Sequence, residues 1–125
     1  MAARRSRYRA GVLAEAAAAW MLRAKGWRIL GRRVRTPVGE IDLIARRGQV
    51  TIFVEVKRRR RGDDALQALT PRQRRRIMQA ARFWLAAHPR ALDGPCRFDL
   101  VAVNRWLWPR HVIHAFDEGT DGRWD

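Results

Sequence analysis

Residues 39–57 read GEIDLIARRGQVTIFVEVK. Residues 40–45 and 50–56 are two runs rich in β-branched and other apolar residues, and the turn-forming segment 46–49 joins them. This pattern predicts a β-hairpin. Charged residues interrupt both runs, although the residues around them are those of a protein core. The segment therefore predicts a chemical role as well as a local structure.

Four charged residues of this hairpin share strand faces. Side chains two residues apart in a strand project to the same side, so Glu40 lies with Asp42, and Glu55 lies with Lys57. If Gly48-Gln49 is a two-residue turn, Asp42 lies opposite Glu55 and Glu40 lies opposite Lys57. A displaced turn would give other partners. The alternative is a solvated strand face on which Glu40 simply pairs with Lys57.

Two carboxylates directly opposite each other would have Cβ atoms about 5 Å apart, which is unfavourable unless a positive charge lies between them. A divalent cation supplies that charge, and oxygen ligands favour Mg²⁺ or Mn²⁺ over zinc. Such a site suits phosphodiester hydrolysis. The Lys57 side chain would position the nucleophile, deprotonate it as a neutral amine, or stabilise developing charge as an ammonium. Only Lys25 and Lys57 are lysines among 27 basic residues, which favours a specific role for the Lys57 amine.

The composition is that of a folded and strongly basic protein. The 27 basic and 12 acidic residues give a formal net charge of +15, while 47% of the residues are hydrophobic. This hydrophobic content suffices for a packed core and is too high for a disordered basic tail. The charge predicts a polyanionic partner, with nucleic acid favoured over an anionic membrane surface.

Two further features predict a cytoplasmic protein. The longest apolar run, residues 16–22, is too short to span a bilayer, and Glu15 interrupts the apolar stretch that a signal peptide needs. Cys96 is the only cysteine, so it cannot form an internal disulfide, and it has no neighbours at the spacing of a zinc site. We therefore expect a reducing compartment and no membrane association.

The remaining pattern predicts a single α/β domain over residues 1–125, with a basic N-terminal arm (1–8) and a frayed C-terminus (118–125). The expected order is α-β-β-β-α-β-β. Its elements are a helix at 9–25 stopped by Gly26, a strand at 27–35, the hairpin, a connector or short helix at 62–68, a helix from Thr70-Pro71 to Pro89, and strands at 97–104 and 111–116.

The acidic motifs carry a family resemblance. Glu40-Ile41-Asp42 and Glu55-Val56-Lys57 resemble the signature of the PD-(D/E)xK nuclease superfamily, and the element order is similar to its restriction-endonuclease-like core. More closely, the chain resembles the YraN family of predicted bacterial endonucleases, which are related to archaeal Holliday junction resolvases. The similarity runs from Gly11 to Phe116. It implies a mixed sheet flanked by helices and a Mg²⁺- or Mn²⁺-dependent endonuclease acting on branched or otherwise structured DNA.

The resemblance also implies roles for single residues. Asp42 and Glu55 would be metal ligands, and Lys57 would be the catalytic amine. Glu15 falls where a glutamate of the first helix joins the metal carboxylates in resolvase relatives, although it also fits an ordinary helix surface. Glu40 is a further catalytic candidate whose role the resemblance does not define.

Two positions depart from the family pattern. Gln73 stands where members commonly carry a lysine, and Arg33 stands where many have asparagine. A non-catalytic nucleic-acid-binding module that retains the nuclease fold is therefore the alternative function, although retention of the whole acidic set argues against it. RNA is an alternative partner to DNA, and symmetric cleavage of a junction would require a homodimer.

Basic residues beyond the hairpin form the expected nucleic-acid contacts, since an arginine run continues directly from Lys57 and one face of the following helix is basic. A solvated charge run is the simpler alternative. The candidates are Arg58, Arg59, Arg60, Arg61, Arg72, Gln73, Arg75 and Arg76.

The aromatic and histidine residues are expected to be structural. Trp20 and Trp84 fit the core faces of helices. Trp106 and Trp108 share a strand-like parity and could stack on bases, but packing in the core or in a loop is favoured. His111 and His114 would face opposite sides of a strand and so make a poor chelate.

Overall fold

The secondary-structure elements follow the predicted order. The computed structural model describes the backbone of residues 2–58 and 68–116, and the side chains of residues 11–58, 68–91 and 93–116. The elements are α1 (Ala2–Ala24), β1 (Arg28–Thr36), β2 (Gly39–Arg47), β3 (Val50–Arg58), α3 (Pro71–Ala87), α4 (Pro89–Leu92), β4 (Cys96–Val103) and β5 (Pro109–Phe116). Most of the connector expected at 62–68, and the C-terminal residues 118–125, lie outside the described residues.

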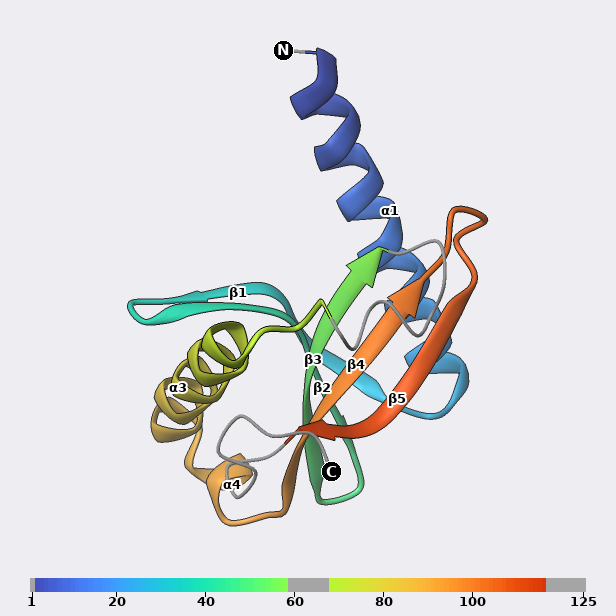
Figure 1. The fold of residues 1–125 in the computed structure, drawn as a ribbon. Coiled ribbons are helices and arrows are strands. Elements are labelled where there is room, and N and C mark those ends of the chain that lie inside the picture. Colours follow the sequence, from blue (N-terminus) through green and yellow to red (C-terminus); the bar gives the residue numbers. More distant parts are fainter. Residues whose placement is uncertain (1, 59–67, 117–125) are drawn as a thin grey trace.

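The strands form one mixed sheet in the order β1-β2-β3-β4-β5. Strands β3 and β4 are parallel and are joined through α3, whereas the other neighbouring strands are antiparallel. Helices α1 and α3 lie on different sides of this sheet (Figure 1). The predicted α/β class, with a restriction-endonuclease-like mixed sheet flanked by helices, is confirmed. Within the described residues, no helix combines the length and apolar character needed to cross a bilayer.

Two hydrophobic clusters hold the layers together, because alternate residues of the central strand β3 project to opposite faces. Ile52 and Val54 belong to the cluster beneath α1. Phe53 belongs to the cluster beneath α3. The centroid of its ring lies 5.8 Å from that of Trp84, in an edge-on arrangement, and 5.6 Å from that of Phe98. The core position predicted for Trp84 is confirmed.

Helix α1 buries a narrow stripe of small residues. Ala14, Ala18 and Leu22 recur every four residues and are fully buried against the sheet. Trp20 lies two residues from Ala18, which is more than half a turn around the helix, and it is 69% exposed. The core position predicted for Trp20 is therefore wrong, because the alanine stripe, rather than the larger side chain, faces the sheet.

The two ends of α1 differ in how well the sequence predicted them. The helix ends at Ala24, and Gly26 has a positive φ of 92° and donates its N–H to the carbonyl of Arg23, as a glycine stop does. It begins at Ala2 rather than at Arg9, so the backbone of the expected basic arm is helical from residue 2. This first part of the helix extends beyond the sheet (Figure 1).

The β1–β2 hairpin leaves the sheet and packs on α3. Pairing between β2 and β3 runs from Arg47↔Val50 to Leu43↔Val54, whereas pairing between β1 and β2 continues to Thr36↔Gly39. The tip approaches the helix closely: a Cβ at Gly39 would lie 3.3 Å from the carbonyl oxygen of Arg76. The first residues of β2 therefore follow α3 rather than β3.

Helix α3 has the predicted N-terminus and the predicted two faces. Thr70 and Gln73 form a reciprocal capping box, with Pro71 in the first turn. The buried residues are Arg74, Ile77, Ala80, Ala81, Trp84 and Leu85. Arg72, Arg75, Arg76 and Gln79 are exposed, so the helix presents a basic surface to solvent.

Candidate functional site

Asp42 and Glu55 form the centre of the candidate site. They follow directly on the Leu43↔Val54 pair, at the point where β2 separates from β3, so the hairpin register predicted from the Gly48-Gln49 turn is confirmed. The side chains of Asp42 and Glu55 are hydrogen-bonded to each other. The backbone N–H of Val56 also donates to Oδ2 of Asp42, at 2.8 Å. The backbone of β3 thus fixes the carboxylate of Asp42 beside Glu55.

The environment of this pair raises the pKa of both groups. Burial raises the pKa of Asp42 to about 6, the charge of Glu15 adds to that rise, and the hydrogen bond from Val56 opposes it. Burial, followed by the charge of Asp42, raises the pKa of Glu55 to about 8. The two groups titrate as a pair, because their shared hydrogen bond requires a proton. At neutral pH the pair therefore retains a proton unless a cation replaces it.

Lys57 lies beside Glu55, as the strand alternation predicts. Its Nζ is 3.5 Å from Oε1 of Glu55, and both side chains are only 16% exposed. The ammonium lowers the pKa of both Glu55 and Asp42, although burial outweighs it at each group. Asp42, Glu55 and Lys57 therefore form a single, largely buried constellation at the edge of the β2–β3 pairing.

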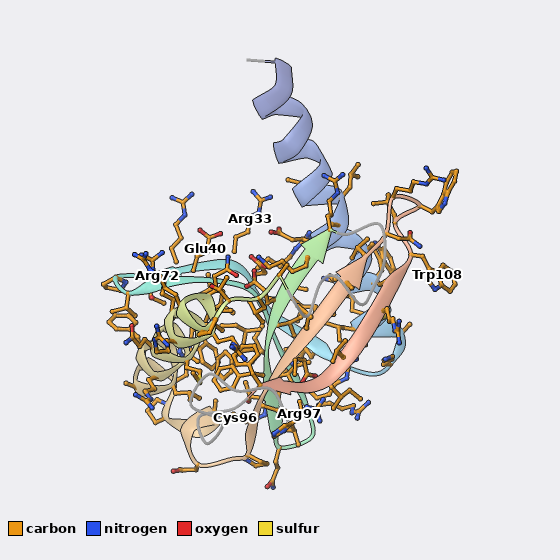
Figure 2. The ribbon with its side chains drawn as sticks, viewed as in Figure 1. Arg33, Glu40, Arg72, Cys96, Arg97 and Trp108 are labelled. Carbon is orange, nitrogen blue, oxygen red and sulfur yellow. The ribbon has the colours of Figure 1, made fainter. Side chains whose placement is uncertain are left out.

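Glu40 does not join this constellation. Its side chain is 46% exposed, and its Oε2 lies 3.7 Å from Nε of Arg35 across the β1–β2 hairpin. The predicted pairing of Glu40 with Lys57 is wrong because β2 has already left β3 at this point and follows α3 instead. Figure 2 shows Arg33, Glu40 and Arg72 projecting on the same side of the molecule, from β1, β2 and α3.

Glu15 approaches the carboxylate pair but is engaged by an arginine. Its charge acts on Asp42, which places it near the site as the resemblance implies. However, Nε of Arg33 donates to Oε2 of Glu15 at 2.7 Å. Among the residues that the structure describes, no three His, Cys, Asp or Glu side chains gather as a metal-binding group. The role of Glu15 as a third ligand stays a prediction.

Arg33 is the residue that sequence reasoning missed. It lies between the pairs Arg32↔Leu43 and Val34↔Ile41, so it stands beside Asp42 in the β1–β2 register, and it has a positive φ of 50°. The sequence marked it only as a departure from the family pattern. The turn at Thr36–Gly39 was the signal that could have found it, because this turn sets the register of β1 against β2 as Gly48-Gln49 sets that of β2 against β3.

The residues fit a hard divalent cation in part. Asp42 and Glu55 offer adjacent carboxylate oxygens, and burial raises the pKa of both by disfavouring their charged forms. A cation bound between them would stabilise the charged forms. Glu15 could add a third carboxylate only after releasing Arg33.

The basic residues expected to contact nucleic acid lie on two exposed surfaces. Arg58 ends β3 directly after Lys57 and is exposed, as are Arg72, Arg75 and Arg76 on α3. Gln73 is exposed as well, but its Oε1 accepts a hydrogen bond from the backbone N–H of Thr70, so its observed role is to cap α3. Arg59, Arg60 and Arg61 lie outside the described residues.

A second buried carboxylate, Asp99, lies on β4 opposite Val54 of β3 and organises the pairing of β4 with β5. Both side-chain oxygens accept hydrogen bonds from Arg97 at 2.8 Å, and Oδ2 also lies 2.7 Å from Nε2 of His111. The backbone N–H of His114 donates to Oδ1, which stabilises the irregular pairing of β4 and β5 there. Burial alone would raise the pKa of Asp99, but these hydrogen bonds lower it to about 2. His111 is structural here, as predicted.

Comparison with known proteins places the chain in a family. The model of "Uncharacterised protein family UPF0102" matches residues 14–103. A UPF0102 protein of Bradyrhizobium diazoefficiens is 52% identical over 113 residues, which cover 90% of this chain and 85% of that protein. A UPF0102 protein of Rhodopseudomonas palustris is 54% identical over 88% of this chain and 82% of its own length. A UPF0102 protein of Parvibaculum lavamentivorans is 48% identical over 87% of this chain and 82% of its own length. The chain belongs to the UPF0102 family, the YraN family that its acidic motifs resemble.

Proposed function

We propose that this protein is a metal-dependent endonuclease that hydrolyses phosphodiester bonds in branched or otherwise structured DNA. The observation that carries the proposal is the apposition of Asp42 and Glu55 with Lys57 3.5 Å from Glu55. Two buried carboxyl groups with raised pKa values and an adjacent amine are costly for stability, and such arrangements are concentrated at functional sites. The exposed arginines on α3 and at the end of β3 would contact the DNA backbone.

Each residue of the constellation has a distinct chemical task in this proposal. Asp42 and Glu55 would hold Mg²⁺ or Mn²⁺, which, when bound, supplies Lewis-acid activation of the scissile phosphate and of water. The hydrogen bond from Val56 fixes the orientation of Asp42. Lys57, as the neutral amine, would accept the proton of the attacking water, or, as the ammonium, would stabilise the charge that develops on the phosphoryl oxygens.

A non-catalytic nucleic-acid-binding module is the second candidate function. The ion pair between Arg33 and Glu15 favours it, because Arg33 occupies the carboxylate that the family resemblance assigns to the metal. In that case the basic surfaces bind nucleic acid, and the buried acidic pair is what remains of an ancestral site. DNA and RNA then become equivalent partners for a surface that contacts the phosphate backbone.

Cleavage assays with an isosteric variant distinguish the two functions. End-labelled four-way junction, flap and linear DNA are incubated with Mg²⁺, Mn²⁺ or EDTA and with wild type, Glu55→Gln or Asp93→Asn, all purified identically. Asp93 is exposed at the end of α4, so its variant is a control that also loses one carboxylate. Metal-dependent products that only Glu55→Gln fails to give support the nuclease. Salt-sensitive binding without products from any of the three proteins overturns it in favour of the binding module.

A further inference from the structure

The turn between β4 and β5 carries two tryptophans that the structure exposes. Trp106 is 75% exposed and Trp108 is 73% exposed. The sequence favoured packing of both rings in the core or in a loop, and this expectation is wrong. Large aromatic rings are ordinarily the most strongly buried surface of a small domain, so two neighbouring exposed rings mark an interaction surface. Figure 2 shows Trp108 at the outer edge of the molecule.

Hydrogen bonds within the turn fix the backbone that carries both rings. The side-chain oxygen of Asn104 accepts from the backbone N–H groups of Trp106 and Trp108, at 2.9 and 3.0 Å. The backbone of Asn104 pairs with both Leu107 and Trp108. Leu107 adopts a positive φ of 60°, which closes the turn. The two rings are therefore presented by a pre-organised turn, which reduces the entropy lost on binding.

The turn lies at the same end of the sheet as the candidate site. Arg58, directly after Lys57, pairs with Val103 of β4, and Val103 pairs with Pro109 of β5. Residues 104–108 therefore continue past the end of β3, and Figure 1 shows the turn beside that end. From strand spacing and rise, the turn is about 15–20 Å from Glu55. This distance is short enough for one nucleic acid to contact both places.

The charges around the turn suit a polyanion with exposed bases. The guanidinium of Arg105 lies over the ring of Trp106, 4.9 Å from its centroid. Exposed Arg110 follows the turn on β5, and exposed Arg58 ends β3, which is two strands away from β5 in the sheet. Aromatic rings interleaved with arginines are typical of surfaces that stack on bases while neutralising the adjacent phosphates.

We propose that Trp106 and Trp108 stack on unpaired bases, so that the protein binds nucleic acids in which a single-stranded segment adjoins a duplex. This proposal rests on the proposed function for its partner and adds a substrate class to it: flaps, gapped or open junctions and single strands are preferred to blunt duplex. The duplex part lies toward the arginines of β3 and α3, and the unpaired bases meet the turn.

Fluorescence anisotropy in EDTA tests the proposal independently of cleavage. Labelled single strand, flap and blunt duplex are titrated at one salt concentration with wild type, Trp106→Ala/Trp108→Ala, Trp106→Phe/Trp108→Phe and Trp20→Ala. Trp20 is the matched control, because it is an exposed tryptophan on α1. We expect the alanine variant to lose about tenfold in affinity for single strand and flap, and less than twofold for duplex. The phenylalanine variant should retain most of the affinity, because its rings still stack.

Equal losses on single strand and duplex, or unchanged binding by the alanine variant, overturn the proposal. So does tryptophan-dependent binding to vesicles of phosphatidylcholine and phosphatidylglycerol with unchanged nucleic-acid binding, because the turn then contacts membranes. Failure of the nuclease proposal is separate: wild type would give no cleavage while the tryptophan-dependent preference persists. If wild type cleaves and the alanine variant binds normally, only the base-stacking proposal fails.

Discussion

Arg33 donates to Glu15 across 2.7 Å, and this ion pair lies next to Asp42. The two residues come from β1 and α1, and they stand where the family resemblance places an asparagine and a metal-binding glutamate. In the proposed metal site, the pair would therefore control whether Glu15 can serve as a third carboxylate.

Replacing Arg33 tests that control. In Arg33→Asn, Glu15 loses its guanidinium partner, and we expect Mn²⁺ to bind about tenfold more tightly, since the affinity of such sites rises with the number of carboxylate ligands. Isothermal titration calorimetry measures the change. The double variant Arg33→Asn/Glu15→Gln should lose the gain. If the single variant binds Mn²⁺ no better than wild type, Glu15 does not act as a ligand.

Glu55→Gln should change how stability depends on pH in metal-free protein. The pKa of Glu55 is raised from 4.5 to about 8, so the folded state binds more protons than the unfolded state in that window. Stability therefore falls as pH rises from about 4.5 to 8. We expect Glu55→Gln to flatten this fall and to be more stable than wild type at pH 9 by at least about 1 kcal/mol, given about 1.4 kcal/mol per pKa unit.

Urea denaturation in EDTA at pH 5, 7 and 9 provides the measurement for this prediction. Asp93→Asn, at an exposed position, should follow the wild-type profile. A Glu55→Gln profile parallel to that of wild type would contradict a raised pKa at Glu55.

Lys57 should require an amine and not merely a positive charge. Lys57→Arg retains the charge beside Glu55, but guanidinium does not deprotonate at accessible pH. We expect both Lys57→Arg and Lys57→Met to lose cleavage by about 10²-fold or more, with DNA affinity in Lys57→Arg within about twofold of wild type. Single-turnover cleavage and anisotropy measure the two quantities. Near-normal cleavage by Lys57→Arg would reduce the role of Lys57 to charge compensation.

Asp99→Asn should destabilise the fold without touching the candidate site. The change leaves Arg97 and His111 without their shared buried carboxylate, and breaking such a buried network costs about 3 kcal/mol. Because hydrogen bonds lower the pKa of Asp99 to about 2, its contribution is present above about pH 4 and is lost as pH falls toward 2. Urea midpoints at pH 7 and pH 3 test both statements. A midpoint at pH 7 equal to that of wild type would refute them.

The sequence by itself determined the features that depend on neighbouring residues. Strand alternation and the two-residue turn at Gly48-Gln49 brought Asp42 opposite Glu55 and placed Lys57 beside it, because a hairpin register follows from the local geometry of its turn. The capping box at Thr70 likewise begins α3 where the pattern predicts.

Tertiary structure decided the features that depend on packing between distant elements. Helix α3 draws the β1–β2 hairpin away from β3, so Glu40 meets Arg35 instead of Lys57. Contact between α1 and β1 brings Arg33 to Glu15. Local periodicity contains no information about these contacts, because they form between elements that are far apart in the sequence.

The tryptophans also show that burial depends on packing between distant elements. Spacing along the chain predicted a core position for Trp20 and packing in the core or in a loop for Trp106 and Trp108. The space against the sheet is filled instead by the alanines of α1 and by residues of the strands themselves. Whether an apolar ring is buried depends on whether another element covers it, and that is settled only when the whole chain has folded.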